Sequence, residues 1–128
     1  MDSGQHDERV IGQLEKTVLD CPDPGALAAF YAEILGMRVN EDSGDWVVIG
    51  REPGDRALAF QRASTWVPPR WPDAQHPQQL HLDIRVQDVN TAERAVLALG
   101  AQRLPATRET GFRVFADPVG HPFCLVFG

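Results

Sequence analysis

Four polar side chains in this sequence combine residue types that can do chemistry with a spacing that can bring them together. They are Lys16, Gln61, His81 and Cys124. Histidine nitrogen and cysteine thiolate are ordinary ligands of zinc, whereas a lysine amine in an apolar pocket can act as a nucleophile. Lys16 and His81 are separated by 65 positions, and so are Asp23 and Asp88. This shared offset indicates an internal repeat, and we expect the four side chains to form a central polar ring.

Several chemistries fit these residues, and the sequence does not choose between them. Cys124 with His81 would form a nucleophile and its base, and His81 with Asp83 would form an acid–base pair. Lys16 would form a Schiff base if it were buried, or it pairs with Asp20 or Asp83 in a purely structural role. A small buried cysteine usually serves packing, and no catalytic cysteine motif surrounds Cys124. We therefore assign no catalytic residue.

The two copies of the repeat show the same order of elements. Each begins with a strand-like run that ends in Asp and continues into a helix-like run that ends in Leu-Gly, at residues 16–36 and 81–100. Asp23 and Asp88 stand where helix N-caps belong, and apolar residues then recur at helical spacing. Three strand-like runs follow each helix, at residues 37–39, 46–50 and 57–62, and again at residues 102–104, 112–115 and 122–127. The pattern predicts an α+β fold of two tandem βαβββ modules.

The repeat also predicts how the chain is divided. We expect a flexible N-terminal tail over residues 1–12 and a single domain over residues 13–128. Within that domain the modules span about residues 13–64 and 79–128, joined by a Pro-rich linker at residues 65–78. A four-stranded sheet with one helix buries only the face that its helix covers. We therefore expect the two modules to form a curved mixed sheet around a cavity.

The alternation of side chains along the strands predicts which residues line that cavity. In the first strand Lys16 and Asp20 point away from the face of Leu19. In the fifth strand His81 and Asp83 share the face opposite Leu82 and Ile84. The apolar faces should pack on the helices, so the polar faces should line the cavity, where water or a ligand satisfies them. Each of these polar residues could instead be an ordinary strand residue that is exposed to solvent. The internal repeat favours the hypothesis that they share one site.

Aromatic side chains gather near the linker. Trp66 and Trp71 lie in a Pro-stiffened stretch, and Trp46 is the third tryptophan of the chain. In the linker, Trp66 and Trp71 would form the rim of a cavity for a flat apolar ligand, and Arg70 would clamp an acidic group. A cover for the outer sheet face or for a dimer interface fits them equally well. The complete set of predicted ligand-binding residues is Lys16, Asp20, Trp46, Gln61, Trp66, Arg70, Trp71, His81, Asp83 and Cys124.

Composition limits the classes of partner. The net charge of −6 argues against a nucleic-acid or anionic membrane surface. No apolar run approaches the length of a membrane span, and the polar, acidic first dozen residues lack the pattern of a signal peptide. Cys21 and Cys124 stand alone, without a CxxC pair, as expected of reduced thiols. These features predict a cytoplasmic protein.

Three segments carry a resemblance to a known family. They are Cys21-Pro-Asp-Pro with the following LAAFYAEILG, the strand from His81 to Asp88, and the Asp117-Pro-Val-Gly-His-Pro-Phe-Cys ending. Together they resemble the glyoxalase/bleomycin-resistance/dioxygenase (vicinal oxygen chelate) superfamily, in particular its glyoxalase-like domain branch, over residues 14–128. The resemblance implies paired βαβββ modules around a ligand cavity, and it implies a homodimer.

The resemblance also implies where a metal would bind. In metal-dependent members, four strands each supply one ligand, His or Glu, to a divalent ion that acts as a Lewis acid. Those positions fall on Lys16, about Gln61, His81 and Cys124, so His81 alone keeps a classical ligand. A protonated lysine repels the ion, glutamine is a weak donor, and His81 with Cys124 would make half a zinc site. We therefore expect no tight metal centre and no cofactor, with His81 as a weak candidate ligand and His121 as a turn residue.

These observations lead to a function hypothesis with two alternatives. The first is a metal-independent small-molecule binding protein of the bleomycin-resistance type. The second is a divalent-metal-dependent lyase, isomerase or dioxygenase of the same superfamily. The third is an interaction module whose role is dimerisation. Whether the chain is an enzyme stays open at this point.

Overall fold

Strand, helix and three further strands follow one another twice along the chain. The structure is a computed structural model that describes residues 10–70, 73–75, 77, 80–105 and 110–128. Its elements are β1 (Thr17–Cys21), α1 (Pro24–Leu35), β2 (Arg38–Asp42), β3 (Trp46–Gly50), β4 (Leu58–Arg62), β5 (Leu82–Arg85), α2 (Val89–Ala98), β6 (Gln102–Arg103), β7 (Phe112–Ala116) and β8 (Pro122–Val126). Neither described helix is long and apolar enough to cross a membrane. Trp71 and most of the predicted N-terminal tail lie outside the described residues.

The strands form two four-stranded mixed sheets, one in each half of the chain. The first has the order β1-β4-β3-β2 and the second the equivalent order β5-β8-β7-β6. The first strand of each half pairs in parallel with the last, and the remaining neighbours are antiparallel. The predicted α+β fold of two tandem βαβββ modules is confirmed.

Both helices begin at the predicted aspartates. Asp23 accepts a hydrogen bond from the Ala26 backbone N–H at 3.2 Å, and Asp88 accepts one from Thr91 N–H at the same distance. Each carboxylate satisfies a backbone donor that the first helical turn leaves free. Gly36 ends α1 in the left-handed conformation, with φ 65°, which glycine adopts without strain. The two copies of the cap therefore fix where each module turns from strand to helix.

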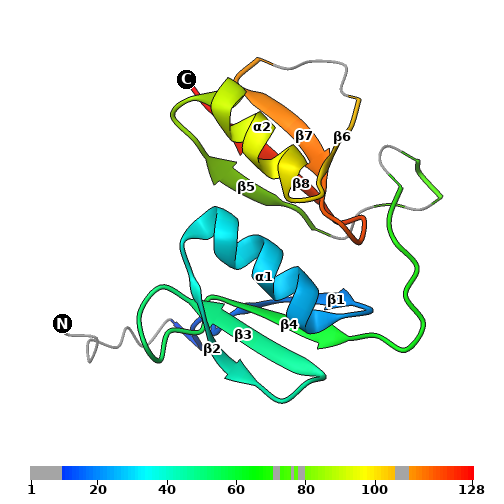
Figure 1. The fold of residues 1–128 in the computed structure, drawn as a ribbon. Coiled ribbons are helices and arrows are strands. Elements are labelled where there is room, and N and C mark those ends of the chain that lie inside the picture. The colour runs from blue at the N-terminus through cyan, green and yellow to red at the C-terminus, as the bar shows by residue number, and fades with distance from the viewer. Residues whose placement is uncertain (1–9, 71–72, 76, 78–79, 106–109) are drawn as a thin grey trace.

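A single apolar core joins the two modules. Leu19 and Phe60 of the first sheet and Phe123 of the second are all buried in one cluster. Helix α1 lies between the first sheet and the second module (Figure 1), so its residues reach both. Phe30 and Tyr31 of α1 make edge-to-face contacts with Phe123, with ring centroids 6.0 and 6.1 Å apart. Helix α1 is therefore the element that packs the halves together.

A buried hydrogen bond crosses from the first module to the second. The Tyr31 hydroxyl donates to Asp117 Oδ2 at 2.7 Å, and both side chains are buried. Asp117 Oδ1 accepts three backbone N–H groups of its own turn, from Val119, Gly120 and His121, at 2.9–3.0 Å. Burial, together with the Asp117 carboxylate, raises the pKa of Tyr31 well above its ordinary value. The hydroxyl thus stays protonated and remains a donor.

The linker is held against the same turn. The Trp66 indole N–H donates to the Val119 carbonyl at 2.9 Å. Gly120 has φ 107°, and a Cβ placed there would lie 2.7 Å from Cβ of Pro68, which is closer than real side chains approach. Glycine is therefore required at position 120 by its backbone conformation and by this close approach of the linker.

We predict that Tyr31→Phe lowers the free energy of unfolding by about 1–3 kcal/mol, because a buried carboxylate oxygen loses its hydrogen-bond donor. The ring is kept, so packing in the core should change little. Urea denaturation followed by circular dichroism measures the effect. Ser43→Ala removes a hydroxyl whose bond to the Trp46 carbonyl is exposed and long, at 3.4 Å, and should change stability by less than about 0.5 kcal/mol. Equal stability of wild type and Tyr31→Phe would contradict a stabilising role for this bond.

Candidate functional site

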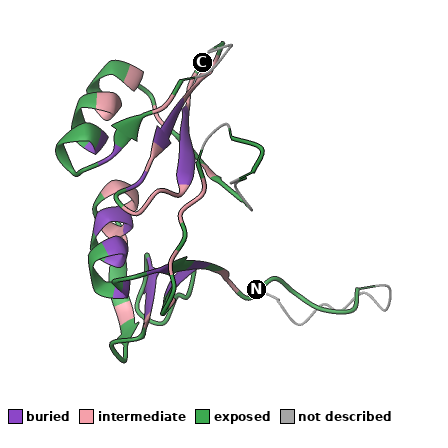
Figure 2. Ribbon diagram, turned by 90° about the vertical axis from the view of Figure 1, so that its right-hand side faces the viewer, coloured by how far each residue is buried: buried purple, intermediate pink, exposed green. Residues whose placement is uncertain are grey.

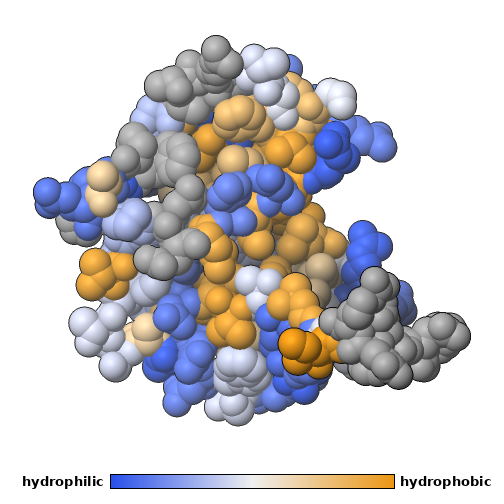
Figure 3. Space-filling model, turned by 180° about the vertical axis from the view of Figure 1, so that it is seen from behind, coloured by the Kyte–Doolittle hydropathy of each residue, from blue (hydrophilic) through white to orange (hydrophobic). Residues whose placement is uncertain are grey.

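Each sheet leaves one face uncovered by its helix. Both helices lie on one side of the molecule (Figure 2). Figure 3 views the opposite side, where apolar side chains gather across the middle of the surface. The strand residues on the uncovered faces are those that alternation predicted to point away from the helices, because Leu19, Phe60, Ile84 and Phe123 all belong to the helix-covered core. Candidate binding surfaces therefore lie on the uncovered side.

The first hollow lies where the modules and the linker meet, and we call it the inter-module hollow. Its volume is about 470 Å³. Its residues come from β1 and β4 of the first module, from the linker, and from the turn before β8. They are Val18, Leu19, Asp20, Gln61, Trp66, Val67, Pro68, Pro69, Gln75, Pro77, Leu80 and His121. Most of this wall is apolar, with a carboxylate, amides and an imidazole as the polar groups.

His121 is the functional candidate that the sequence missed. We expected a turn residue, and it does follow the Asp117 turn, but its side chain also lines the inter-module hollow. Its Nε2 lies 2.6 Å from the Asp20 carbonyl oxygen, and its ring centroid lies 4.7 Å from that of Trp66. Alternation along β8 could not reveal this role, because His121 stands before the strand begins.

The second hollow lies on the uncovered face of the second sheet, and we call it the second-sheet hollow. It has a volume of about 360 Å³. Its polar residues are His81, Asp83 and Cys124, and its apolar wall comes mainly from β7 and β8. The full lining is His81, Asp83, Gly111, Phe112, Val114, Pro122, Cys124 and Val126. Three of the predicted ligand-binding residues therefore share one surface.

His81, Asp83 and Cys124 form a compact cluster of donor atoms. Asp83 and Cys124 are direct partners in the parallel pair of β5 and β8. His81 stands just before β5, two residues ahead of Asp83, and lines the same hollow. His81 Nε2 lies 3.1 Å from Asp83 Oδ1. One ligand atom of each residue lies within 4.8 Å of the others. The acid–base pair that sequence spacing alone left open is thus in contact.

The environment of Cys124 opposes a thiolate. Its side chain is buried, and burial is the main reason that its pKa rises to about 11. The negative charge of Asp83, and a hydrogen bond to it, add to the effect. A thiol with this pKa is protonated at neutral pH and is a poor nucleophile. The nucleophile–base pair of Cys124 and His81, one of the chemistries that the sequence left open, therefore lacks an activated sulfur.

Lys16 lines neither of these two hollows. Its ammonium pairs with the Glu15 carboxylate at 2.9 Å rather than with the predicted Asp20 or Asp83, and this bond lowers the pKa of Glu15. Its Nζ also lies 5.7 Å from the centroid of the Trp46 ring, a cation–π distance. Only 11% of the Lys16 side chain is exposed, so the lysine is a largely covered cation that is paired with Glu15 beside Trp46.

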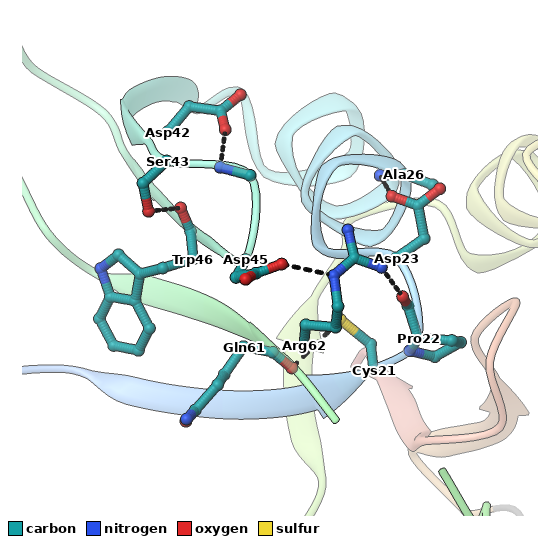
Figure 4. A network of polar contacts seen from close by, with 11 residues as sticks. Cys21, Pro22, Asp23, Ala26, Asp42, Ser43, Asp45, Trp46, Gln61 and Arg62 are labelled. Atoms are coloured by element: carbon teal, nitrogen blue, oxygen red, sulfur yellow. Dashed lines mark hydrogen bonds and ion pairs between the residues drawn. The ribbon is translucent and has the colours of Figure 1, made fainter. Parts of the chain in front are cut away.

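Trp46 and Gln61 are cross-strand partners in β3 and β4. Gln61 points away from α1 (Figure 4), and its neighbour Arg62 binds Asp45 and the Pro22 carbonyl. Arg62 thereby holds the end of β4 against the start of α1. Arg70 lines a separate surface with Gly100 and Gln102, outside both hollows. Trp71 is a predicted site residue outside the described residues.

The predicted ring of four is therefore distributed over several surfaces. Gln61 lines the inter-module hollow, His81 and Cys124 line the second-sheet hollow, and Lys16 lies beside Trp46. At the four superfamily metal positions, an ammonium and a neutral amide take the place of two anionic or imidazole ligands. This donor set does not fit the divalent ion of the metal-dependent members.

Comparison with solved structures shows the fold. A glyoxalase/bleomycin resistance protein/dioxygenase family enzyme from Burkholderia phytofirmans aligns with a TM-score of 0.68 and 18% identity, over 91% of this chain and 98% of that one. A fosfomycin resistance protein from Listeria monocytogenes aligns with a TM-score of 0.67 and 18% identity, over 93% and 95%. The trypanothione-dependent glyoxalase I of Leishmania major aligns with a TM-score of 0.64 and 19% identity, over 91% of this chain and 86% of that one. At these identities the likeness concerns architecture.

Sequence comparison identifies the family. No curated protein sequence matches the chain. The sequence model of the glyoxalase-like domain, in contrast, matches residues 16–126, which is nearly the whole chain and includes both modules. The predicted resemblance is confirmed: this chain belongs to the glyoxalase-like domain family, within the glyoxalase/bleomycin resistance/dioxygenase superfamily.

Proposed function

We propose that the protein binds a small planar molecule in the inter-module hollow, without the four-ligand metal centre of its superfamily. The observation that carries this proposal is the hollow itself. Its volume of about 470 Å³ falls in the range of small-molecule sites, and its wall is mainly apolar with a few polar groups. Trp66 offers a flat face, while Gln61 and His121 offer hydrogen bonds. Of the predicted site residues, the proposal assigns Asp20, Gln61 and Trp66 to the ligand and adds His121.

The loss of metal ligands supports binding rather than metal-assisted chemistry. The ammonium of Lys16, held by Glu15, occupies a classical ligand position of the first sheet. Gln61, at another such position, lines the hollow with a neutral amide. An amide can donate and accept hydrogen bonds, so it is better suited to recognising a polar ligand group than to holding a divalent ion.

A second candidate function is a divalent-metal-dependent lyase, isomerase or dioxygenase. The clustered donors His81, Asp83 and Cys124 favour it, because they offer a potential ion site. A relevant relative is the Listeria monocytogenes fosfomycin resistance protein, of which one variant has been solved with Mn(II) and 1S,2S-dihydroxypropylphosphonic acid. We rank this function second, because the positions equivalent to classical ligands in the first module are Lys16 and Gln61.

Two further properties belong to the proposal. We infer a homodimer, because superfamily members commonly pair and both sheets leave a face free of helix, with apolar side chains gathered between the modules (Figure 3). We also infer a cytoplasmic location, which the two free cysteines support: both are buried and neither is in a disulfide. The acidic net charge supports a small-molecule partner rather than nucleic acid or an anionic membrane.

Ligand binding is tested with a panel of planar aromatic compounds, screened by intrinsic tryptophan fluorescence and then measured by calorimetry. We predict that Trp66→Phe weakens binding by about tenfold, equivalent to ~1.4 kcal/mol, since the hollow loses part of its flat wall. Trp46→Phe is the matched control, because Trp46 does not line this hollow. Protein treated with a chelator should bind as tightly as untreated protein. Absence of any response, or binding that requires a metal, would count against the proposed function.

Cysteine reactivity tests the exclusion of a nucleophilic thiol. Burial raises the pKa of both Cys21 and Cys124 to about 11. We predict slow alkylation of the folded protein by iodoacetamide at pH 7, with a rate that rises about tenfold per pH unit below the pKa, as the thiolate fraction grows. Unfolding in urea, measured with a chelator present throughout, should speed the reaction. Rapid alkylation of Cys124 in the folded protein at pH 7 would make it a candidate nucleophile.

Association is tested by light scattering coupled to size-exclusion chromatography. The inferred homodimer should give twice the chain mass of 14.2 kDa at micromolar concentration. Val18 is partly exposed on the uncovered face of the first sheet, so Val18→Lys should shift the population towards monomer if that face is the interface. Leu97→Lys, on the exposed surface of α2, is the control and should leave the mass unchanged. A monomer at all concentrations would refute the inference.

A further inference from the structure

The polar groups of the inter-module hollow point to one class of ligand. We propose that the hollow selects planar organic cations that carry N–H donors, such as aromatic amidinium groups, over neutral or anionic molecules of the same shape. This inference rests on the proposed function, because it concerns the same hollow, and it adds the charge that separates one planar ligand from another. The residue that sets the preference is Asp20.

Asp20 brings an unpaired carboxylate to the hollow. It lies on β1, directly beside Gln61 of β4 in the parallel register, and both residues line the hollow. Its backbone carbonyl is the partner of His121 Nε2, but no group in the described part of the chain donates to its carboxylate. Among the described residues that line the hollow, none is a lysine or an arginine. The carboxylate is therefore available to a ligand.

The cations nearest to Asp20 in the first sheet and the linker are engaged elsewhere. Lys16, four positions earlier, pairs with Glu15 at 2.9 Å. Arg62, which follows Gln61, pairs with the Asp45 carboxylate at 2.6 Å. Arg70 of the linker lines the separate surface at Gly100. The negative charge in the hollow thus lacks a neighbouring counter-charge, which favours a cationic ligand.

The remaining polar groups of the wall are mainly acceptors. The Trp66 N–H already donates to the Val119 carbonyl, so the indole offers its ring alone. The Asp20 carbonyl can only accept, so His121 Nε2 carries the hydrogen, and Nδ1 of the neutral ring keeps a lone pair. The two side-chain amides can present either a donor or an acceptor. Three further lining residues have no backbone N–H, namely Pro68, Pro69 and Pro77. A ligand rich in N–H donors matches this wall.

Desolvation turns the carboxylate into a filter. Asp20 is exposed in the free protein and is hydrated there. A planar ligand that lies against the apolar wall displaces this water. A cation replaces the lost hydration with a charge-assisted hydrogen bond, which is stronger than a neutral one, and the face of Trp66 attracts the same charge. A neutral ligand leaves the carboxylate covered and unpaired, and an anion adds repulsion, so both are disfavoured.

Three compounds that share one ring system test the preference on the full-length chain. At neutral pH 2-naphthamidine is a cation with N–H donors, 2-naphthamide is neutral, and 2-naphthoate is an anion. Calorimetry should show that 2-naphthamidine binds at least about tenfold more tightly than 2-naphthamide, the size of effect expected for a hydrogen bond to a charged group. The anion 2-naphthoate should bind most weakly.

A variant and a matched control assign the preference to Asp20. Asp20→Asn keeps the size of the side chain and removes its charge, so it should weaken binding of 2-naphthamidine by about tenfold without weakening that of 2-naphthamide. Glu33→Gln removes the same charge from the exposed surface of α1, outside the hollow, and should keep the wild-type preference. Circular dichroism verifies that both variants are folded.

The possible failures separate this inference from the proposed function. The preference is overturned if 2-naphthamide or 2-naphthoate binds the wild type as tightly as 2-naphthamidine. It is also overturned if another planar compound binds while 2-naphthamidine does not, if Asp20→Asn retains the preference, or if Glu33→Gln loses it. In each of these cases binding of a planar molecule stands. Absence of binding by every planar compound would instead refute the proposed function, and the charge preference with it.

Discussion

The buried carboxylate of Asp117 is the interaction on which the arrangement of both hollows depends. A buried charge needs compensating hydrogen bonds, and Asp117 accepts them from three backbone N–H groups of its own turn and from the Tyr31 hydroxyl of the other module. The turn fixes the start of β8, and Tyr31 fixes α1 against it. His121 lies just before β8 and lines the inter-module hollow, whereas Cys124 lies within β8 and lines the second-sheet hollow.

Duplicated modules have produced two surfaces with different chemistry. The inter-module hollow exists because the linker is pinned to the Asp117 turn through Trp66 and Pro68, so its walls come from both halves of the chain. The second-sheet hollow belongs to the second module alone. One surface is a mainly apolar wall with a carboxylate, amides and an imidazole, and the other carries clustered metal-ligand atoms. The two modules therefore share the same strand order, while their different side chains give the two hollows different linings.

Membership of the glyoxalase-like domain family fixes the architecture and leaves the chemistry to the side chains. In the first module the ammonium of Lys16 pairs with its sequence neighbour Glu15. In the second, His81 keeps its place and gains Asp83 and Cys124 as close neighbours. These differences are the reason that we infer ligand binding rather than the metal chemistry of the superfamily.

The sequence by itself determined the fold and the face of each strand residue. Asp caps, helical spacing and strand alternation act over only a few residues. Local pattern therefore predicted the helix starts at Asp23 and Asp88 and the ten elements among the described residues. It also predicted the side of the sheet to which His81, Gln61 and Cys124 point. Only the tertiary structure decided which of these side chains meet. Contact between Asp83 and Cys124 depends on a strand register that joins residues 41 positions apart in the chain, and the place of His121 depends on packing between modules and linker. Such long-range distances are set by how the core closes around Tyr31 and Phe123, which no local pattern encodes.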